Sequence, residues 1–209
     1  MTIRNGNNHG ANKRWYGSGL PYLEQKPLPG HLIIIEGADG VGRSTQIELL
    51  GPWLELEGFA VSNTGWTRSP LLSATISEAK AGHQLTATTF SLLYAADFAD
   101  RLEHEILPAL QAGFIVIADR YMYTAFARNT VMGADPVWTR QLFQMALIPD
   151  LVFYLDIDVQ TLAPRVVQGK GMDYWESGMH LGLATDIFDS FKDYQGRLIG
   201  EYKRMAEEF

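Results

Sequence analysis

The sequence predicts an α/β fold in which a parallel β-sheet is covered by helices on both faces. Two observations predict it. Short apolar runs alternate along the chain with longer stretches in which apolar residues recur at helical spacing. The runs read as strands buried on both faces of a sheet. Because strand–helix–strand units connect by right-handed crossovers, this alternation produces a parallel sheet between two helical layers.

Residues 1–30 lie outside that alternation. They are rich in Gly, Asn and Pro and show neither the helical nor the strand period. We therefore expect an irregular N-terminal arm, with simple disorder as the alternative. Four bulky residues suggest that part of the arm packs: Trp15, Tyr16, Pro21 and Tyr22. The remaining residues, 31–209, are predicted to form one α/β domain.

The strands and helices follow in order from His31. The predicted strands are 31–36, 59–65, 114–120 and 151–157. The predicted helices are 45–58, about 86–112, two short ones before Pro149, and a last one from about 184 to 209. Ligands of parallel sheets bind at the carboxyl ends of the strands, beside a switch in strand order. Segments that directly follow a strand are therefore the candidates for a functional site.

Composition narrows the function. The chain has 209 residues, a formal net charge of −7 and no cysteine. A negative overall field argues against binding to nucleic acid or to an anionic membrane, and the lack of cysteine excludes disulfides and thiolate metal sites. No apolar run approaches the roughly 20 residues of a membrane span, and the N-terminus lacks the apolar core of a signal peptide. We expect a cytoplasmic enzyme or binding protein that concentrates its cations locally if it handles phosphates.

The segment after the first strand has the pattern of a phosphate-binding loop. In "GADGVGRST" four residues separate Gly37 from Gly42, and a cation and a hydroxyl residue follow. Glycines let the backbone curl so that its N–H groups form an anion nest, and the next helix adds its positive end. A plain glycine turn is the alternative. The residues expected to bind ATP are Gly37, Asp39, Gly40, Val41, Gly42, Arg43, Ser44 and Thr45. The pattern predicts the three-layer P-loop NTPase fold.

Arg43 departs from that pattern, which has lysine at this position. Arginine keeps the charge and the reach, but a planar fork does not replace a compact ammonium where geometry is tight. Phosphate binding should survive the change. Stabilisation of a transferring phosphoryl group by Arg43 is the open question.

Four segments of the chain resemble sequences of the thymidylate kinase family. They are "IIIEGADGVGRSTQ", "GWTRSPL", "FSLLYAADFADRLEHEILPALQAGFIVIADRYMYTAFA" and "GMDYWESG". The likeness covers about residues 31–205, in the family's order and near its spacing. An Asp within the loop, together with Asp-Arg-Tyr after the third strand, separates this family from other P-loop kinases.

The resemblance implies an acceptor site for a nucleoside monophosphate. Asp39 matches the acid that contacts the acceptor's 3′-hydroxyl, and Arg68 and Arg120 match the arginines that hold its phosphate. Tyr94 matches an aromatic residue that stacks on the base, and Thr124 a small hydroxyl residue that lines the pocket. Read from the residues alone, the acid could stabilise a turn, the arginines could form surface salt bridges and the tyrosine could be a core residue.

The resemblance also implies a metal site and a lid. Asp119 would hold Mg²⁺ or its waters together with Ser44. The lid, around 169–178, lies between two helices. Its acidic pair is Asp173 and Glu176, and Lys170 or Arg165 could supply charge to the transferred group. Dimerisation through the long helices is implied by the family only.

Two further departures bear on function. Phe98, one helical turn beyond Tyr94, stands where the family often has an arginine that reads the thymine edge. We therefore expect relaxed selection among pyrimidine monophosphates, or a preference for one other than dTMP. If selection is instead steep, Arg101 is the next candidate reader. The family also continues past the last helix with a fifth strand and an adenine-binding loop, whereas this chain ends at Phe209.

The sequence thus predicts a kinase that converts ATP and dTMP into ADP and dTDP. Arg43, Asp119, Arg120 and Lys170 are the predicted catalytic residues. A kinase of another or modified pyrimidine nucleotide, and a catalytically silent nucleotide-binding protein, are the alternatives.

Overall fold

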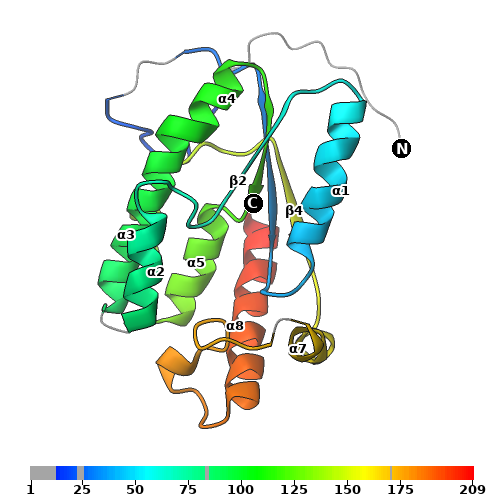
Figure 1. Ribbon diagram of the computed structural model, residues 1–209. Coiled ribbons are helices and arrows are strands. Elements are labelled where there is room, and N and C mark those ends of the chain that lie inside the picture. Colours follow the sequence, from blue (N-terminus) through cyan, green and yellow to red (C-terminus); the bar gives the residue numbers. More distant parts are fainter. Residues whose placement is uncertain (1–12, 23–25, 83–84, 170) are drawn as a thin grey trace.

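The computed structural model describes residues 13–22, 26–82, 85–169 and 171–209 (Figure 1). Its sheet has four parallel strands in the order β2-β3-β1-β4. They are β1 (His31–Gly37), β2 (Val61–Gly65), β3 (Ile115–Asp119) and β4 (Leu151–Leu155). All four predicted strands and their parallel arrangement are confirmed.

Helices cover both faces of this sheet. The α-helices are α1 (Arg43–Leu56), α2 (Ser73–Gly82), α3 (Ala87–Arg101), α4 (Leu107–Gln111), α5 (Met122–Val131), α6 (Pro136–Leu142), α7 (Val159–Gln168) and α8 (Ile187–Glu208). A π-helix, η1 (Leu102–Ile106), joins α3 to α4, and a 3₁₀ helix, η2 (Met179–Leu181), precedes α8. The predicted long helix at 86–112 is therefore one helical tract with a wide turn inside it. Helix α2 was not predicted.

Alternate residues of the central strands supply the two cores. Leu32 and Ile34 of β1 face a large cluster built with α3, α4, α5 and α8. Ile33 and Ile35 of the same strand face α1, where they pack with Leu54. Figure 1 shows this arrangement, with α1 on one side of the sheet and α3, α4 and α5 on the other. The three-layer α/β prediction is confirmed.

The described part of the N-terminal arm lies against the segment that leads into β4. Trp15 forms an antiparallel bridge with Leu147, and the Tyr16 N–H donates to the carbonyl of Ala146 at 2.7 Å. Tyr22, by contrast, is 99% exposed. The arm thus packs through its first two bulky residues.

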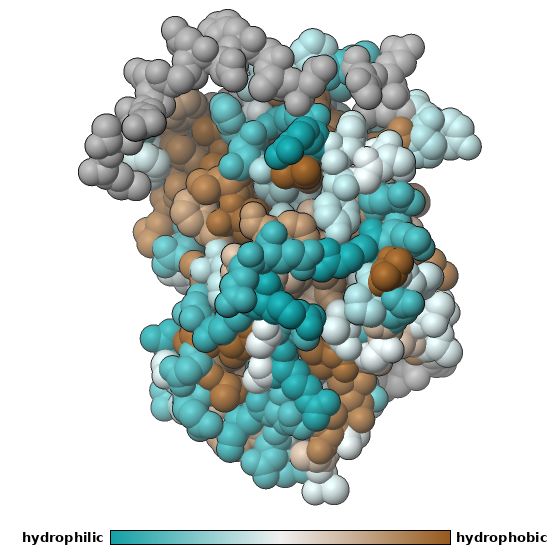
Figure 2. All heavy atoms as spheres, turned by 180° about the vertical axis from the view of Figure 1, so that it is seen from behind, coloured by the Kyte–Doolittle hydropathy of each residue, from teal (hydrophilic) through white to brown (hydrophobic). Residues whose placement is uncertain are grey.

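Several apolar side chains stay exposed. Leu92, expected on the buried side of the long helix, is 49% exposed. Leu151, Val152 and Phe153 are exposed on β4, which forms one edge of the sheet. The view from behind shows apolar surface in the upper half of the molecule (Figure 2). Within the described ranges, no helix combines the length and the apolar character needed to cross a membrane.

Candidate active site

The two segments singled out from the sequence meet at one edge of the sheet. Strands β1 and β3 are neighbours, with Ile35 opposite Asp119. The glycine loop leaves the carboxyl end of β1, and Asp119-Arg120-Tyr121 leaves that of β3. Two cavities, one polar and one aromatic, lie beside them.

The loop after β1 depends on glycine backbone geometry. Gly37, Gly40 and Gly42 have φ angles of 147°, 86° and 107°, which favour glycine. A Cβ on Gly37 would lie 2.9 Å from the carbonyl oxygen of Leu155, and one on Gly40 would lie 2.4 Å from Val166 Cγ2. Helix α1 then begins at Arg43, so its unpaired N–H groups follow the loop directly.

Arg43 is held by three acceptors. Its Nε donates to Asp119 Oδ1 at 2.7 Å, and its Nη1 donates to the carbonyls of Gly37 at 2.7 Å and Ala38 at 2.5 Å. The two charged side chains are only 10% and 13% exposed. The residue that departs from the loop pattern therefore binds the expected Mg²⁺ ligand and the loop backbone at once.

The polar cavity has a volume of about 410 Å³. Five cationic side chains and three carboxylates line it, although the chain as a whole carries a net charge of −7. Its lining residues are Asp39, Gly40, Gly42, Arg43, Ser44, Trp66, Thr67, Arg68, Lys80, Asp119, Arg120, Arg128 and Glu176. The local concentration of cations required for an acidic protein that binds phosphates is present.

Asp39 lies between two arginines of this cavity. Arg120 Nη2 donates to Asp39 Oδ1, and Arg128 Nη2 donates to Asp39 Oδ2 at 3.1 Å. Arg120 has a φ of 74°, in the left-handed region that side chains other than glycine rarely adopt. Such backbone strain persists where the surroundings fix a conformation. Here the ion pair and a bond from Nη1 to Thr124 Oγ1 at 3.2 Å fix it.

Thr124 lies behind Arg120 and lines neither cavity. It is completely buried, and its hydroxyl donates to Glu36 Oε2 at 2.8 Å. The Tyr121 N–H donates to Glu36 Oε1 at 2.7 Å. Burial raises the pKa of the Glu36 carboxyl, against the lowering effect of Arg120. Glu36 and Thr124 thus position the arginine from beneath.

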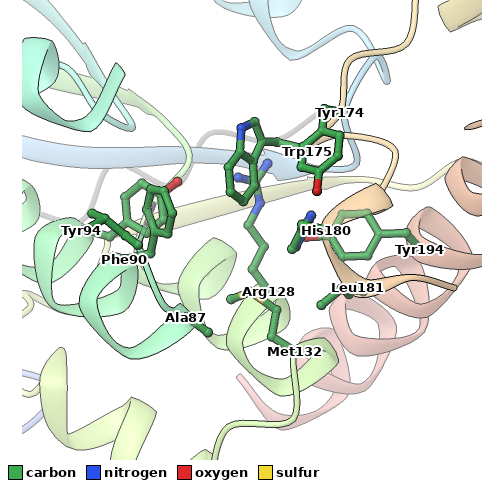
Figure 3. Close-up of a pocket in the computed structure, with 11 residues that line it drawn as sticks. Ala87, Phe90, Tyr94, Arg128, Met132, Tyr174, Trp175, His180, Leu181 and Tyr194 are labelled. Atoms are coloured by element: carbon green, nitrogen blue, oxygen red, sulfur yellow. The ribbon is translucent and has the colours of Figure 1, made fainter. Parts of the chain in front are cut away.

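The aromatic cavity has a volume of about 270 Å³. Figure 3 shows Phe90 and Tyr94 of α3 on one side of it and His180 and Tyr194 on the other. Tyr94, the predicted stacking residue, therefore lines an aromatic cavity, and its contact with a base stays a prediction. The other lining residues are Leu85, Ala87, Arg128, Met132, Tyr174, Trp175 and Leu181.

Phe98 lines neither cavity. It is completely buried, with its ring centroid 4.8 Å from that of Tyr121 and 5.3 Å from that of Phe143. The expectation that it presents an apolar edge to the base does not fit this position. Arg101 is also completely buried and pairs with Asp97 at 2.9 Å.

The lid segment is held to the loop by α8. Gln195 donates to the carbonyl of Glu176 at 2.7 Å and accepts from the Asp39 N–H at 3.4 Å. Glu176 lines the polar cavity, whereas Asp173 accepts from the N–H groups of Trp175 and Glu176 and so shapes the turn.

The remaining predicted residues are distributed as follows. Ser44 and Arg68 line the polar cavity, whereas Thr45 is exposed and outside it, as is Arg165. Lys170 lies outside the described residues.

Two cationic residues of the polar cavity, Arg128 and Lys80, were missed by sequence reasoning. Arg128 lies one helical turn after Thr124, so the spacing from an expected site residue could have pointed to it. Lys80 belongs to the unpredicted helix α2, and burial, followed by the charge of Arg128, lowers its pKa. No pattern in the sequence marked this lysine.

Comparisons with known proteins agree with the geometry. The profile described as thymidylate kinase matches residues 35–180. The chain belongs to the thymidylate kinase family. It is 38% identical to a probable thymidylate kinase 2 of Saccharolobus solfataricus, over 87% of this chain and 85% of the relative. It is 32% identical to a probable thymidylate kinase of Thermococcus gammatolerans, over 86% and 85% of the two chains.

The side chains around the loop suit the phosphates and Mg²⁺ that the thymidylate kinase family implies. Ser44 and Asp119 offer a hydroxyl and a carboxylate in a cavity rich in cations. Such a small set fits Mg²⁺, which keeps several waters and takes its other ligands from phosphates. Within the described ranges, no group of three or more His, Cys, Asp or Glu side chains is arranged so that it could hold a metal ion by itself.

Proposed function

We propose that this protein transfers the terminal phosphoryl group of ATP to dTMP, giving ADP and dTDP. The observation that carries the proposal is the junction of two unlike cavities. One is polar and cationic, the other aromatic, and Arg128 lines both. A nucleoside monophosphate has the same two parts, a flat base and a charged phosphate.

The donor site would be the loop and the start of α1. Backbone N–H groups around Gly40 and Gly42 would receive the ATP phosphates, and Ser44 and Asp119 would hold Mg²⁺. When bound, Mg²⁺ neutralises charge on the phosphates of the donor. Arg43, which bonds to Asp119 and to two loop carbonyls, keeps the glycine loop rigid.

The acceptor site would be the remainder of the two cavities. Arg68 and Arg120 orient the acceptor phosphate, Asp39 accepts from the sugar hydroxyl, and Tyr94 stacks on the base. Glu176 and the aromatic lid residues cover the junction and exclude water. Catalysis is then positional and electrostatic, without a covalent intermediate.

The test is a coupled ADP-release assay with ATP, Mg²⁺ and each nucleoside monophosphate in turn. We expect turnover with dTMP and loss of turnover in Asp119→Asn. The matched control is Asp156→Asn, because Asp156 pairs with Lys203 on the surface. ATP binding without ADP release for any acceptor would identify a silent nucleotide-binding protein instead.

We also propose that the protein is a homodimer. The family implies pairing through the long helices, and the exposed Leu92 on α3 is consistent with it. Sedimentation equilibrium tests this, and a monomer at tens of micromolar concentration would refute it.

A further inference from the structure

The aromatic cavity contains two buried polar atoms that lack a partner. Arg128 Nε and His180 Nδ1 make no hydrogen bond to any described residue. Both residues line the cavity, and Figure 3 shows the Arg128 side chain between the α3 wall and His180. Buried polar groups in folded proteins are rarely left unpaired, so an unpaired pair in one cavity indicates a ligand that completes them.

The surroundings fix what these two atoms can do. Arg128 is anchored by Asp39, and a guanidinium only donates hydrogen bonds. His180 is packed by rings, with its ring centroid 4.9 Å from that of Trp175 and 5.7 Å from that of Tyr194. Burial, followed by the charge of Arg128, lowers the pKa of His180 to about 4. A neutral imidazole with its proton on Nε2 presents Nδ1 as an acceptor.

We propose that Arg128 and His180 read the acceptor's base and select a 4-keto pyrimidine over a 4-amino pyrimidine. The inference rests on the proposed function. In a 4-keto pyrimidine the carbonyl accepts from Arg128 Nε–H, and the adjacent N3–H donates to His180 Nδ1. In a 4-amino pyrimidine an amino group replaces the carbonyl, so that a donor faces a donor. The unpaired guanidinium then penalises the wrong base.

This assignment replaces the base reader expected from α3. Phe98 and Arg101 both lie in the core, away from the cavities. The donor comes instead from Arg128 of α5, and the acceptor comes from His180 of η2. Selection is therefore expected to be steep, in contrast to the relaxed selection that the sequence suggested.

Calorimetric binding of dUMP and dCMP tests the proposal, since these ligands differ only on the edge in question. The wild-type protein should favour dUMP by about 10⁴-fold, because a mismatched buried polar group costs more than the roughly 10–200-fold that shape alone provides. His180→Phe and Arg128→Lys should each reduce that ratio to about 200-fold or less, the range of shape alone. His180→Phe should bind 2-deoxyribose 5-phosphate like the wild type, because this probe has no base and His180 lies outside the polar cavity.

Matched controls make the same chemical changes elsewhere. His104→Phe and Arg197→Lys alter exposed residues outside both cavities and should leave the ratio unchanged. A wild-type ratio of about 200-fold or less, or an undiminished ratio in either cavity variant, would overturn the inference while leaving the kinase intact. If no nucleoside monophosphate binds and no ADP is released, the proposed function itself fails.

Discussion

Substitution of Arg43 tests whether this arginine is a structural part of the loop. Its guanidinium makes three hydrogen bonds, one to a carboxylate and two to backbone carbonyls. The Arg43 side chain is only 10% exposed. Arg43→Ala leaves Asp119 as an uncompensated, largely buried charge. Removing one partner of such a pair typically costs about 3–5 kcal/mol. We expect a loss of that size in the free energy of unfolding.

Arg43→Lys should fall between the wild type and the alanine variant. An ammonium keeps the charge beside Asp119, but it cannot reproduce the planar fork that reaches two carbonyls as well. Losing one or two neutral hydrogen bonds at about 0.5–1.5 kcal/mol each gives a cost of about 1–2 kcal/mol. The order of stability is then wild type, lysine, alanine.

Urea unfolding at pH 7 measures these differences, and calorimetry with ATP measures the effect on the donor site. The double variant Arg43→Ala with Asp119→Ala should be less destabilised than the sum of the single variants, because the pair is removed together. An alanine variant within about 0.5 kcal/mol of the wild type would refute the pairing. Unchanged ATP affinity in that variant would separately refute a role at the donor phosphates.

Three further expectations concern the acceptor side. Arg120→Ala should weaken monophosphate binding by about 1.5–3 kcal/mol and leave nucleoside binding nearly unchanged; equal loss of both in calorimetry would instead indicate misfolding. Lys80→Met should weaken acceptor binding by about tenfold if this lysine contacts phosphate, a change of about 1.4 kcal/mol; unchanged affinity would place it outside the site. His180 has a pKa lowered to about 4, below its ordinary value of 6.5. Its neutral form therefore contributes stability above about pH 6.5 that is lost as the pH falls towards 4, by about 1–2 kcal/mol after allowance for solvent screening. In His180→Phe the free energy of unfolding should change less with pH between 4 and 6.5. An NMR titration of His180 in the wild-type protein with a midpoint near pH 6.5 would contradict the lowered pKa.

The fold was predictable because its strands are short, apolar and strongly separated. The four runs, the glycine loop and the Asp119-Arg120 pair all follow from local pattern, and parallel pairing brings them to one edge of the sheet. Helix α2 was missed because its ten residues, "SATISEAKAG", bury a single apolar side chain, that of Ile76. A helix with so weak an apolar face gives little periodic signal.

The lining of the aromatic cavity was harder to predict, because one face of a helix extends beyond the cavity that it borders. Tyr94 and Phe98 lie on the same side of α3, but one turn is about 5.4 Å long. The first residue therefore reaches the cavity, while the second packs under Tyr121 and Phe143. Spacing places side chains on a common face. Only the tertiary packing shows where along that face the cavity ends.

The geometry at Arg43 bears on whether a loop with arginine in place of lysine can still bind phosphates. A guanidinium has five N–H donors. Nε and Nη1 bond to Asp119, Gly37 and Ala38, which leaves the two N–H groups of Nη2 without a bond to any described residue. Because Arg43 also lines the polar cavity, it can brace the loop and still donate to a phosphate. A lysine has three donors, so the same three bonds would leave none for a phosphate. Arginine at this position is thus compatible with a loop that is stiffened by its own cation and remains able to bind.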